Sequence, residues 1–146
     1  MLIGDKMAHS YHCLCSNFIL ASLQDLSTAP RRGESAQDRA YILPIHPGTE
    51  KPQAVLEGVI KVSEPAVVQR DDGFEKRWLL NCDRCDMPIG YHLDWVQIPD
   101  EQKKDQKEGR KEDVLYVLPG ALVTTGDMQE GKLPPGNEVK LKVASA

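Results

Sequence analysis

The stretch "YHCLCSNFIL", residues 11–20, decides the fold of this 146-residue chain, because it places two cysteines one residue apart in an apolar, strand-like run. The chain has only two further cysteines, Cys82 and Cys85 in "NCDRC". Leu, Ile and Phe dominate the first run, and the polar residues Ser16 and Asn17 interrupt it. This pattern predicts a strand, or a tight hairpin that turns at the second cysteine.

The four cysteines form two closely spaced pairs, C-x-C at Cys13 and Cys15 and C-x-x-C at Cys82 and Cys85. Residues two apart on a strand point to the same face, and a tight turn brings the second pair together in the same way. Four thiolates that converge from two such pairs make the tetrahedral sulfur environment of structural zinc. We therefore expect one structural Zn²⁺, which would contribute an apparent ~10–16 kcal/mol at neutral pH.

Two other interpretations of the cysteines are four separate buried thiols and a set of disulfides. Separate thiols have no reason to occur in two pairs. A disulfide within C-x-C would be strained, and disulfides are rare in a reducing compartment. We expect such a compartment, cytoplasmic or nuclear, because Asp5 and Lys6 interrupt the N-terminus where a secretory signal needs an apolar run. No stretch approaches the ~20 apolar residues of a membrane span, so we expect no membrane insertion.

The remaining sequence predicts a mainly β fold, a small zinc-stapled domain with long loops. Residues 54–82 alternate as a strand meander, residues 27–53 form a long connection with one short strand at 41–45, and residues 114–125 indicate a hairpin around Pro119 and Gly120. We expect a flexible N-terminus over 1–10, a zinc-binding domain over 11–126 and a flexible tail over 127–146. Within the domain, residues 100–113 carry six acidic and five basic side chains and predict an exposed charged loop.

Composition excludes several classes of partner. The length suits one domain with a modest core, and aromatic residues make up only 5% of the chain. The formal net charge of −4 argues against broad attraction to nucleic acid or to anionic lipid. We therefore expect the partners to be other proteins.

Four further segments, "LSTAPRR", "DRAYIL", "RDDGFEKRWLLNCDRCDMPIGYHL" and "VLYVLPGALVTT", extend this pattern. Together with the first cysteine run they resemble the STING ER exit protein family, a eukaryotic group of small zinc-binding proteins. The resemblance covers residues 11–125 and is most specific at the two cysteine pairs, with Pro88 and an aromatic residue shortly after. It implies a β-tent-like domain in which both cysteine pairs bind zinc, and an adaptor, peripheral to the endoplasmic reticulum, that helps a membrane protein leave it.

Two other functions remain as alternatives: a protein component of a nuclear ribonucleoprotein assembly such as the spliceosome, and a zinc or thiol enzyme. Four thiolates fill the shell of a zinc ion and leave no position for water, and no cysteine remains as a nucleophile. We therefore expect no enzymatic activity and no small-molecule substrate. The expected partners are a membrane cargo or vesicle-coat factors, or else spliceosomal proteins.

The side chains near the cysteines have both structural and functional interpretations. His12 and His92 are spare ligands at best, and Trp78, Tyr91 and Trp95 are expected to shield the site from water. A partner surface is predicted over residues 86–95. Its apolar members are Met87, Ile89 and Trp95, and its polar rim is formed by Arg31 and Arg32. The competing interpretation is that the apolar three are core residues.

Overall fold

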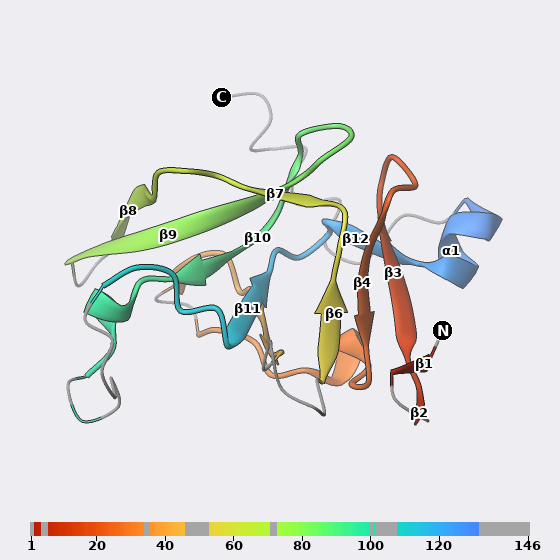
Figure 1. The fold of residues 1–146 in the computed structure, drawn as a ribbon, viewed down its shortest axis with the longest axis horizontal. Helices are drawn as coiled ribbons and strands as arrows, with labels where there is room; N and C mark the ends of the chain where they lie inside the picture. Colours follow the sequence, from red (N-terminus) through yellow and green to blue (C-terminus); the bar gives the residue numbers. More distant parts are fainter. Residues whose placement is uncertain are drawn as a thin grey trace.

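In a computed structural model, the chain folds into two main antiparallel β-sheets that enclose a common core, with a separate two-stranded sheet near the N-terminus and a short α-helix beside the smaller main sheet (Figure 1). The mainly β class predicted from the sequence is confirmed. No helix in the described part of the chain is long and apolar enough to span a bilayer. The structure describes residues 2–3, 6–33, 36–45, 53–70, 73–99, 101 and 108–131.

The smaller sheet has four strands in the order β12, β3, β4 and β6. Their bounds are Leu122–Thr124, His9–Cys13, Phe18–Ser22 and Ala54–Leu56. The strands β3 and β4 form the hairpin predicted around the first cysteine pair, with Tyr11 opposite Leu20. Three of the five β4 side chains are buried aliphatic groups, which explains why this run forms a central strand. The helix α1 (Thr125–Glu130) follows β12 directly.

The larger sheet has six strands, in the order β5, β11, β10, β9 and β7, with β8 paired to the free end of β9. Their bounds are Tyr41–Pro44, Val114–Val117, Pro88–Leu93, Gly73–Cys82, Val59–Lys61 and Ala66–Arg70. The strands β10 and β11 approach closely at Gly90, where a Cβ would lie 2.2 Å from the carbonyl oxygen of Tyr116. Only glycine fits at this point of the sheet.

The main core lies between the two sheets and reaches the cysteines. Both sheets contribute fully buried aliphatic side chains, among them Ile19, Leu43, Leu80 and Leu115. At about 25 cal/mol per Å² of buried apolar surface, this shared layer is the main favourable term that holds the sheets together. Cys13 belongs to the same cluster, so the cysteine end of the domain is continuous with the core.

A second layer covers the outer face of the larger sheet. Residues 29–33 and 36–40 follow the 3₁₀ helix η1 (Leu26–Thr28), and Ala40 packs against Tyr91 and Leu93. An ion network then fixes this segment. The carboxylate of Glu75 accepts hydrogen bonds from three guanidinium groups, those of Arg32, Arg70 and Arg77, at 2.6–2.8 Å.

The predicted hairpin over residues 114–125 is wrong. The strands β11 and β12 do not pair with each other: β11 pairs with β10 and β5, and β12 pairs with β3 in the other sheet. Pro119 and Gly120, the latter with φ of 79°, turn the chain from one sheet to the other. Both apolar runs form strands on either side of a turn, as the pattern predicts, but each strand pairs with other strands.

The predicted ends of the domain differ from the structure. Strands β1 (Leu2–Ile3) and β2 (Lys6–Met7) pair with each other, and β3 begins at His9, within the segment expected to be a flexible N-terminus. At the other end, α1 extends beyond residue 126. Residues 132–146 of the predicted tail lie outside the described residues. The folded unit is therefore longer at both ends than residues 11–126.

The predicted charged loop over residues 100–113 is half integrated into the fold. Residues 100 and 102–107 lie outside the described part of the chain. The segment 108–113 pairs back onto the domain, since Trp95 donates a backbone hydrogen bond to Gly109 at 3.0 Å and Lys111 donates one to Leu93 at 2.8 Å. The Arg110 guanidinium stacks 4.7 Å over Trp78. Polar composition hid this pairing, because backbone bonds do not depend on side-chain polarity.

Candidate metal centre

The first cysteine pair lies in a tight turn at the end of β3. Cys13 is the last residue of the strand, and its backbone carbonyl accepts from Ser16 at 2.8 Å while its N–H donates to Asn17 at 2.8 Å. Ser16 has a positive φ of 77°, which closes the turn. The two sulfurs therefore share one side because of this turn, and not because of strand alternation as the sequence suggested.

The second pair repeats this arrangement at the end of β9. The carbonyl of Cys82 accepts from Asp86 at 2.9 Å, and its N–H donates to Met87 at 2.8 Å. Asp86 has a positive φ of 64°, as Ser16 has in the first turn. In each pair the first cysteine is buried and the second is more exposed. Two hairpins from different sheets thus present equivalent cysteine turns, and both turns lie at the top of Figure 1.

The four sulfur atoms form one compact cluster. All four lie within 4.8 Å of one another, with Cys13 and Cys85 Sγ atoms 3.4 Å apart and Cys15 and Cys82 Sγ atoms 3.6 Å apart. Four thiolates around a tetrahedral ion with bonds of about 2.3 Å would stand about 3.8 Å apart. The observed spacing is close to this value, so the residues fit a metal ion with a complete sulfur shell.

The electrostatic environment of the cluster favours one thiolate. Burial raises the pKa of Cys13 to about 12, and burial also raises that of Cys15. Burial acts in the same direction on Cys82, but the backbone N–H groups of Cys85 and Arg84 outweigh it and lower its pKa to about 6. A divalent cation would favour the deprotonated form of the other thiols as well, because it stabilises every thiolate that it contacts.

Residues that the sequence did not single out complete the surroundings of the cluster. The side-chain amide nitrogen of Asn17 lies 3.4 Å from Cys82 Sγ, 2.8 Å from Asp83 Oδ1 and 3.2 Å from the carbonyl oxygen of Gly58. A Cβ on Gly58 would clash with a backbone oxygen at 2.3 Å, so this close approach requires glycine. The signal was present in the sequence, since Asn17 is a polar residue inside an apolar run.

The histidines and aromatic residues do not belong to the cluster. His12 Nε2 bonds to Thr125 Oγ1 at 3.0 Å, and His92 is buried with Nδ1 2.8 Å from the carbonyl oxygen of Val114. Tyr91 packs on the outer face of the larger sheet, and Trp78 donates to Asp94 Oδ2 at 3.0 Å. The expected aromatic shield is therefore wrong for Tyr91. The buried cysteines pack instead in the core cluster, with aliphatic residues such as Ile19 and Leu80.

The predicted partner residues occupy different environments. Ile89 is 0% exposed and belongs to the core, which excludes it from a contact surface. The Arg32 side chain is 11% exposed and pairs with Glu75. Met87 is 44% exposed, Arg31 is exposed over the ring of Tyr41, and Trp95 is half-buried with the Lys111 ammonium 5.1 Å from its ring. These five side chains do not form one surface.

Comparison with known protein families matches residues 3–132 of this chain to the STEEP1 domain. The match includes both cysteine turns, all strands from β2 to β12 and the helix α1. It extends past the predicted domain boundaries at both ends, in agreement with the strands before residue 11 and the helix after residue 124. This chain therefore belongs to the STEEP1 family, the STING ER exit proteins.

Proposed function

We propose that this chain is a non-catalytic adaptor, built around one structural Zn²⁺, that promotes the exit of a membrane protein from the endoplasmic reticulum. The name of its family supports the trafficking role. The four-sulfur cluster supports the structural role of the metal, because a shell of four thiolates has no open position for substrate or water. The adaptor would act as a protein bound peripherally to the cytoplasmic side of the organelle.

The single observation that carries the proposal is that all four cysteines of the chain meet in one cluster. No further cysteine remains as a nucleophile. With the metal bound, the cluster would tie the β3–β4 hairpin to the β9–β10 hairpin. A rigid two-sheet scaffold then presents its loops and grooves to other proteins, which is what an adaptor requires.

Purified protein should contain one zinc per chain by elemental analysis. Cys82→Ser should lose the metal and several kcal/mol of unfolding free energy, because it opens the shell. The matched control is His12→Ala, which removes a half-buried side chain near the first turn and should cost about 1 kcal/mol. A protein that carries iron, or no metal with four reactive thiols in the folded state, would contradict the zinc assignment.

The trafficking role is tested in cells that contain the natural protein. Depletion should delay the arrival of at least one membrane protein at the Golgi. The maturation of the glycans on that protein measures its arrival. The wild-type chain should restore the rate, whereas Cys82→Ser should not. Two results together would overturn this proposal: every membrane protein that is monitored is exported normally, and the tagged chain is located in nuclear ribonucleoprotein particles.

A further inference from the structure

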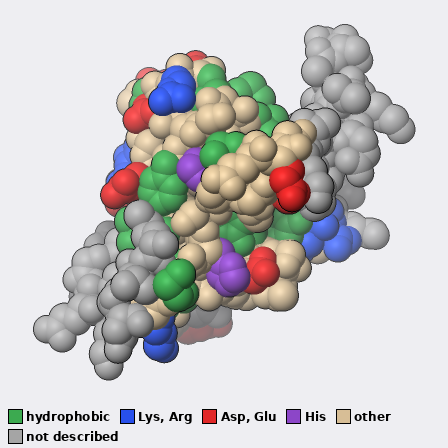
Figure 2. Space-filling view, turned by 90° about the vertical axis from the view of Figure 1, so that its right-hand side faces the viewer, with side chains coloured by type: hydrophobic (Ala, Val, Ile, Leu, Met, Phe, Trp, Pro, Cys, Tyr) green, Lys and Arg blue, Asp and Glu red, His purple; other side chains and the backbone are tan. Residues whose placement is uncertain are grey.

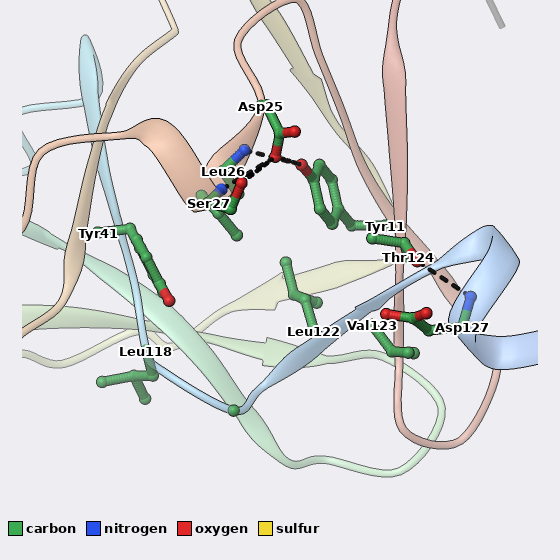
Figure 3. A pocket seen from close by; sticks show the side chains of 11 residues that line it. Tyr11, Asp25, Leu26, Ser27, Tyr41, Leu118, Leu122, Val123, Thr124 and Asp127 are labelled. Atoms are coloured by element: carbon green, nitrogen blue, oxygen red, sulfur yellow. Dashed lines mark hydrogen bonds between the residues drawn. The ribbon is translucent and has the colours of Figure 1, made fainter. Parts of the chain in front are cut away.

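A groove of about 240 Å³ lies between the two sheets, beside the segment that crosses from β11 to β12. Figure 3 shows Leu122 near its centre, between Tyr41 on one side and the helix α1 on the other. Leu118 adds to the apolar lining. Two carboxylates stand at the rim, Asp25 beside η1 and Asp127 on α1. We call this feature the η1–α1 groove.

Asp25 is an ionised group with one free oxygen. Its Oδ1 atom accepts from the backbone N–H of Ser27 at 3.0 Å, from the Ser27 hydroxyl at 2.9 Å and from the Tyr11 hydroxyl at 3.4 Å. The backbone bond from Ser27 is the main cause that holds the pKa of Asp25 below its usual range. Among the described residues, its Oδ2 atom has no hydrogen-bond partner, so a ligand can use it.

Asp127 stands opposite, in the first turn of α1. Its backbone N–H caps the helix through Thr124 Oγ1 at 3.0 Å. In Figure 3 its carboxylate points from the helix toward the groove, and it forms no hydrogen bond or ion pair with another described residue. An unpaired carboxylate beside an apolar surface favours the approach of a cation with an apolar stem.

The charged side chains that line the groove are acidic. The described lining residues include two carboxylates and no lysine or arginine. Arg31 lies outside the lining, stacked over the Tyr41 ring at 4.8 Å with its Nε bonded to the carbonyl oxygen of Arg39. Figure 2 shows the α1 side of the molecule, where Lys and Arg side chains lie toward the margins. A cationic group that enters between Asp25 and Asp127 therefore meets no lysine or arginine among the described residues that line the groove.

We propose that the η1–α1 groove binds a short extended peptide segment in which an apolar side chain lies next to a lysine or arginine. The apolar side chain would pack on Leu118 and Leu122, and the cation would pair with Asp25 and Asp127. The groove is smaller than the ~300–1,000 Å³ typical of small-molecule sites, which favours one or two peptide side chains. This inference rests on the proposed adaptor role, for which it supplies the contact surface.

The direct test is a titration of the zinc-loaded full chain, labelled with ¹⁵N, with the peptide acetyl-Gly-Leu-Lys-Leu-Lys-Gly-amide. We expect saturable shifts of the backbone amide signals of Leu122, Val123 and Asp127. The same peptide with glutamate in place of lysine should produce none, because it would meet two carboxylates. Equal binding of both peptides, or shifts confined to other parts of the chain, would overturn the proposal.

Two matched pairs of variants locate the binding. Asp25→Asn combined with Asp127→Asn keeps the side-chain shapes and should weaken the lysine peptide on the order of tenfold or more. Glu57→Gln combined with Glu64→Gln removes the same charge from exposed positions elsewhere and should leave binding unchanged.

The second pair lies on η1. Ser27→Trp should fill the groove and abolish binding, whereas Thr28→Trp places the same bulk on the neighbouring exposed residue, outside the groove lining, and should preserve it. Equal effects within either pair would contradict the assignment of the groove.

These tests separate the groove from the trafficking role. Peptide binding with normal membrane-protein export would support the groove and overturn the proposed function. Delayed export on depletion, without peptide binding at the groove, would support the proposed function and overturn this inference.

Discussion

Outside the cysteine cluster, Glu75 is a buried charged residue at the centre of an ion network. Its side chain is 4% exposed and faces three guanidinium groups, and hydrogen bonds from Arg32 and Arg77 hold its pKa at about 2 against the opposing effect of burial. Glu75→Gln should lower the free energy of unfolding by about 3–5 kcal/mol, because it leaves buried cations without their counter-charge.

The control for this prediction is Glu112→Gln. Glu112 also pairs with a cation, Lys61, but its side chain is 43% exposed. Exposed pairs contribute at most about 1 kcal/mol, so this variant should remain close to wild type in urea unfolding. Similar losses in both variants would show that the network around Glu75 contributes no more to stability than an exposed ion pair.

His92 should make the stability of the domain depend on pH near neutrality. Burial is the main cause that lowers the pKa of its imidazole below the ordinary 6.5, and Nδ1–H donates to the Val114 carbonyl oxygen in the neutral ring. Below pH 6.5 the unfolded state gains a proton that the folded state resists, so stability falls as the pH falls. Above that value both states are neutral and the effect vanishes.

The check is thermal unfolding of wild type and of His92→Asn between pH 7.5 and 5.5. Asparagine keeps a donor near Val114 and does not titrate. The midpoint of the wild type should fall more steeply with acidification than that of the variant. Parallel curves would show that His92 is protonated to the same degree in both states.

Among the elements, the segment from residue 100 to 113 should divide into two parts. Deleting 103–107 should change the melting temperature by less than about 2 °C, because loop closure costs change slowly with length. Deleting 108–112, the same number of residues, removes the backbone bonds to Leu93 and Trp95 and the stacking of Arg110 on Trp78. It should lower the midpoint by roughly 5–10 °C. Equal midpoints would mean that the pairing contributes nothing.

Strand positions could be predicted from the sequence, but strand partners could not. Apolar runs located β4 and β5, and alternating apolar residues located most of β6 to β9, because both patterns are local properties of the sequence. Partners depend on which edges are free when the core forms. The error at β11 and β12 has this origin. The sequence indicates the turn at Pro119 and Gly120, but the local pattern contains no signal that the two strands belong to different sheets.

The cysteine cluster was predictable for a different reason. Cysteine spacing encodes a long-range contact directly, so Cys13 and Cys82 could be placed together without any knowledge of the sheets. The environment of Arg32 had no such signal, because a Pro- and Gly-rich connection predicts a solvated arginine. Its actual partner is 43 residues away on β9. The two carboxylates of the η1–α1 groove escaped prediction in the same way.

For the whole molecule, removal of the metal should loosen both sheets together. The cluster joins turns that belong to different sheets, so its loss affects the β3–β4 and β9–β10 hairpins equally. Treatment with EDTA should lower the melting midpoint by more than about 10 °C and speed amide hydrogen exchange in both hairpins. EDTA saturated with zinc beforehand is the control and should have no effect. Faster exchange in one hairpin alone would contradict a shared metal.

The distance along the chain between the two cysteine turns has a consequence during synthesis. Cys15 and Cys82 are 67 positions apart, so at about 5–20 residues per second the ribosome needs roughly 3–13 s to supply the second pair after the first. The edge of β3 that pairs with β12 remains unpaired for longer still, until β12 has been synthesised. Two thiolates hold an ion far less tightly than four, so stable binding of a metal ion would wait until Cys82 and Cys85 have been made. A nascent chain that stops before Cys82 retains neither the ion nor a closed sheet, and it is exposed to the quality-control proteases that remove incomplete products.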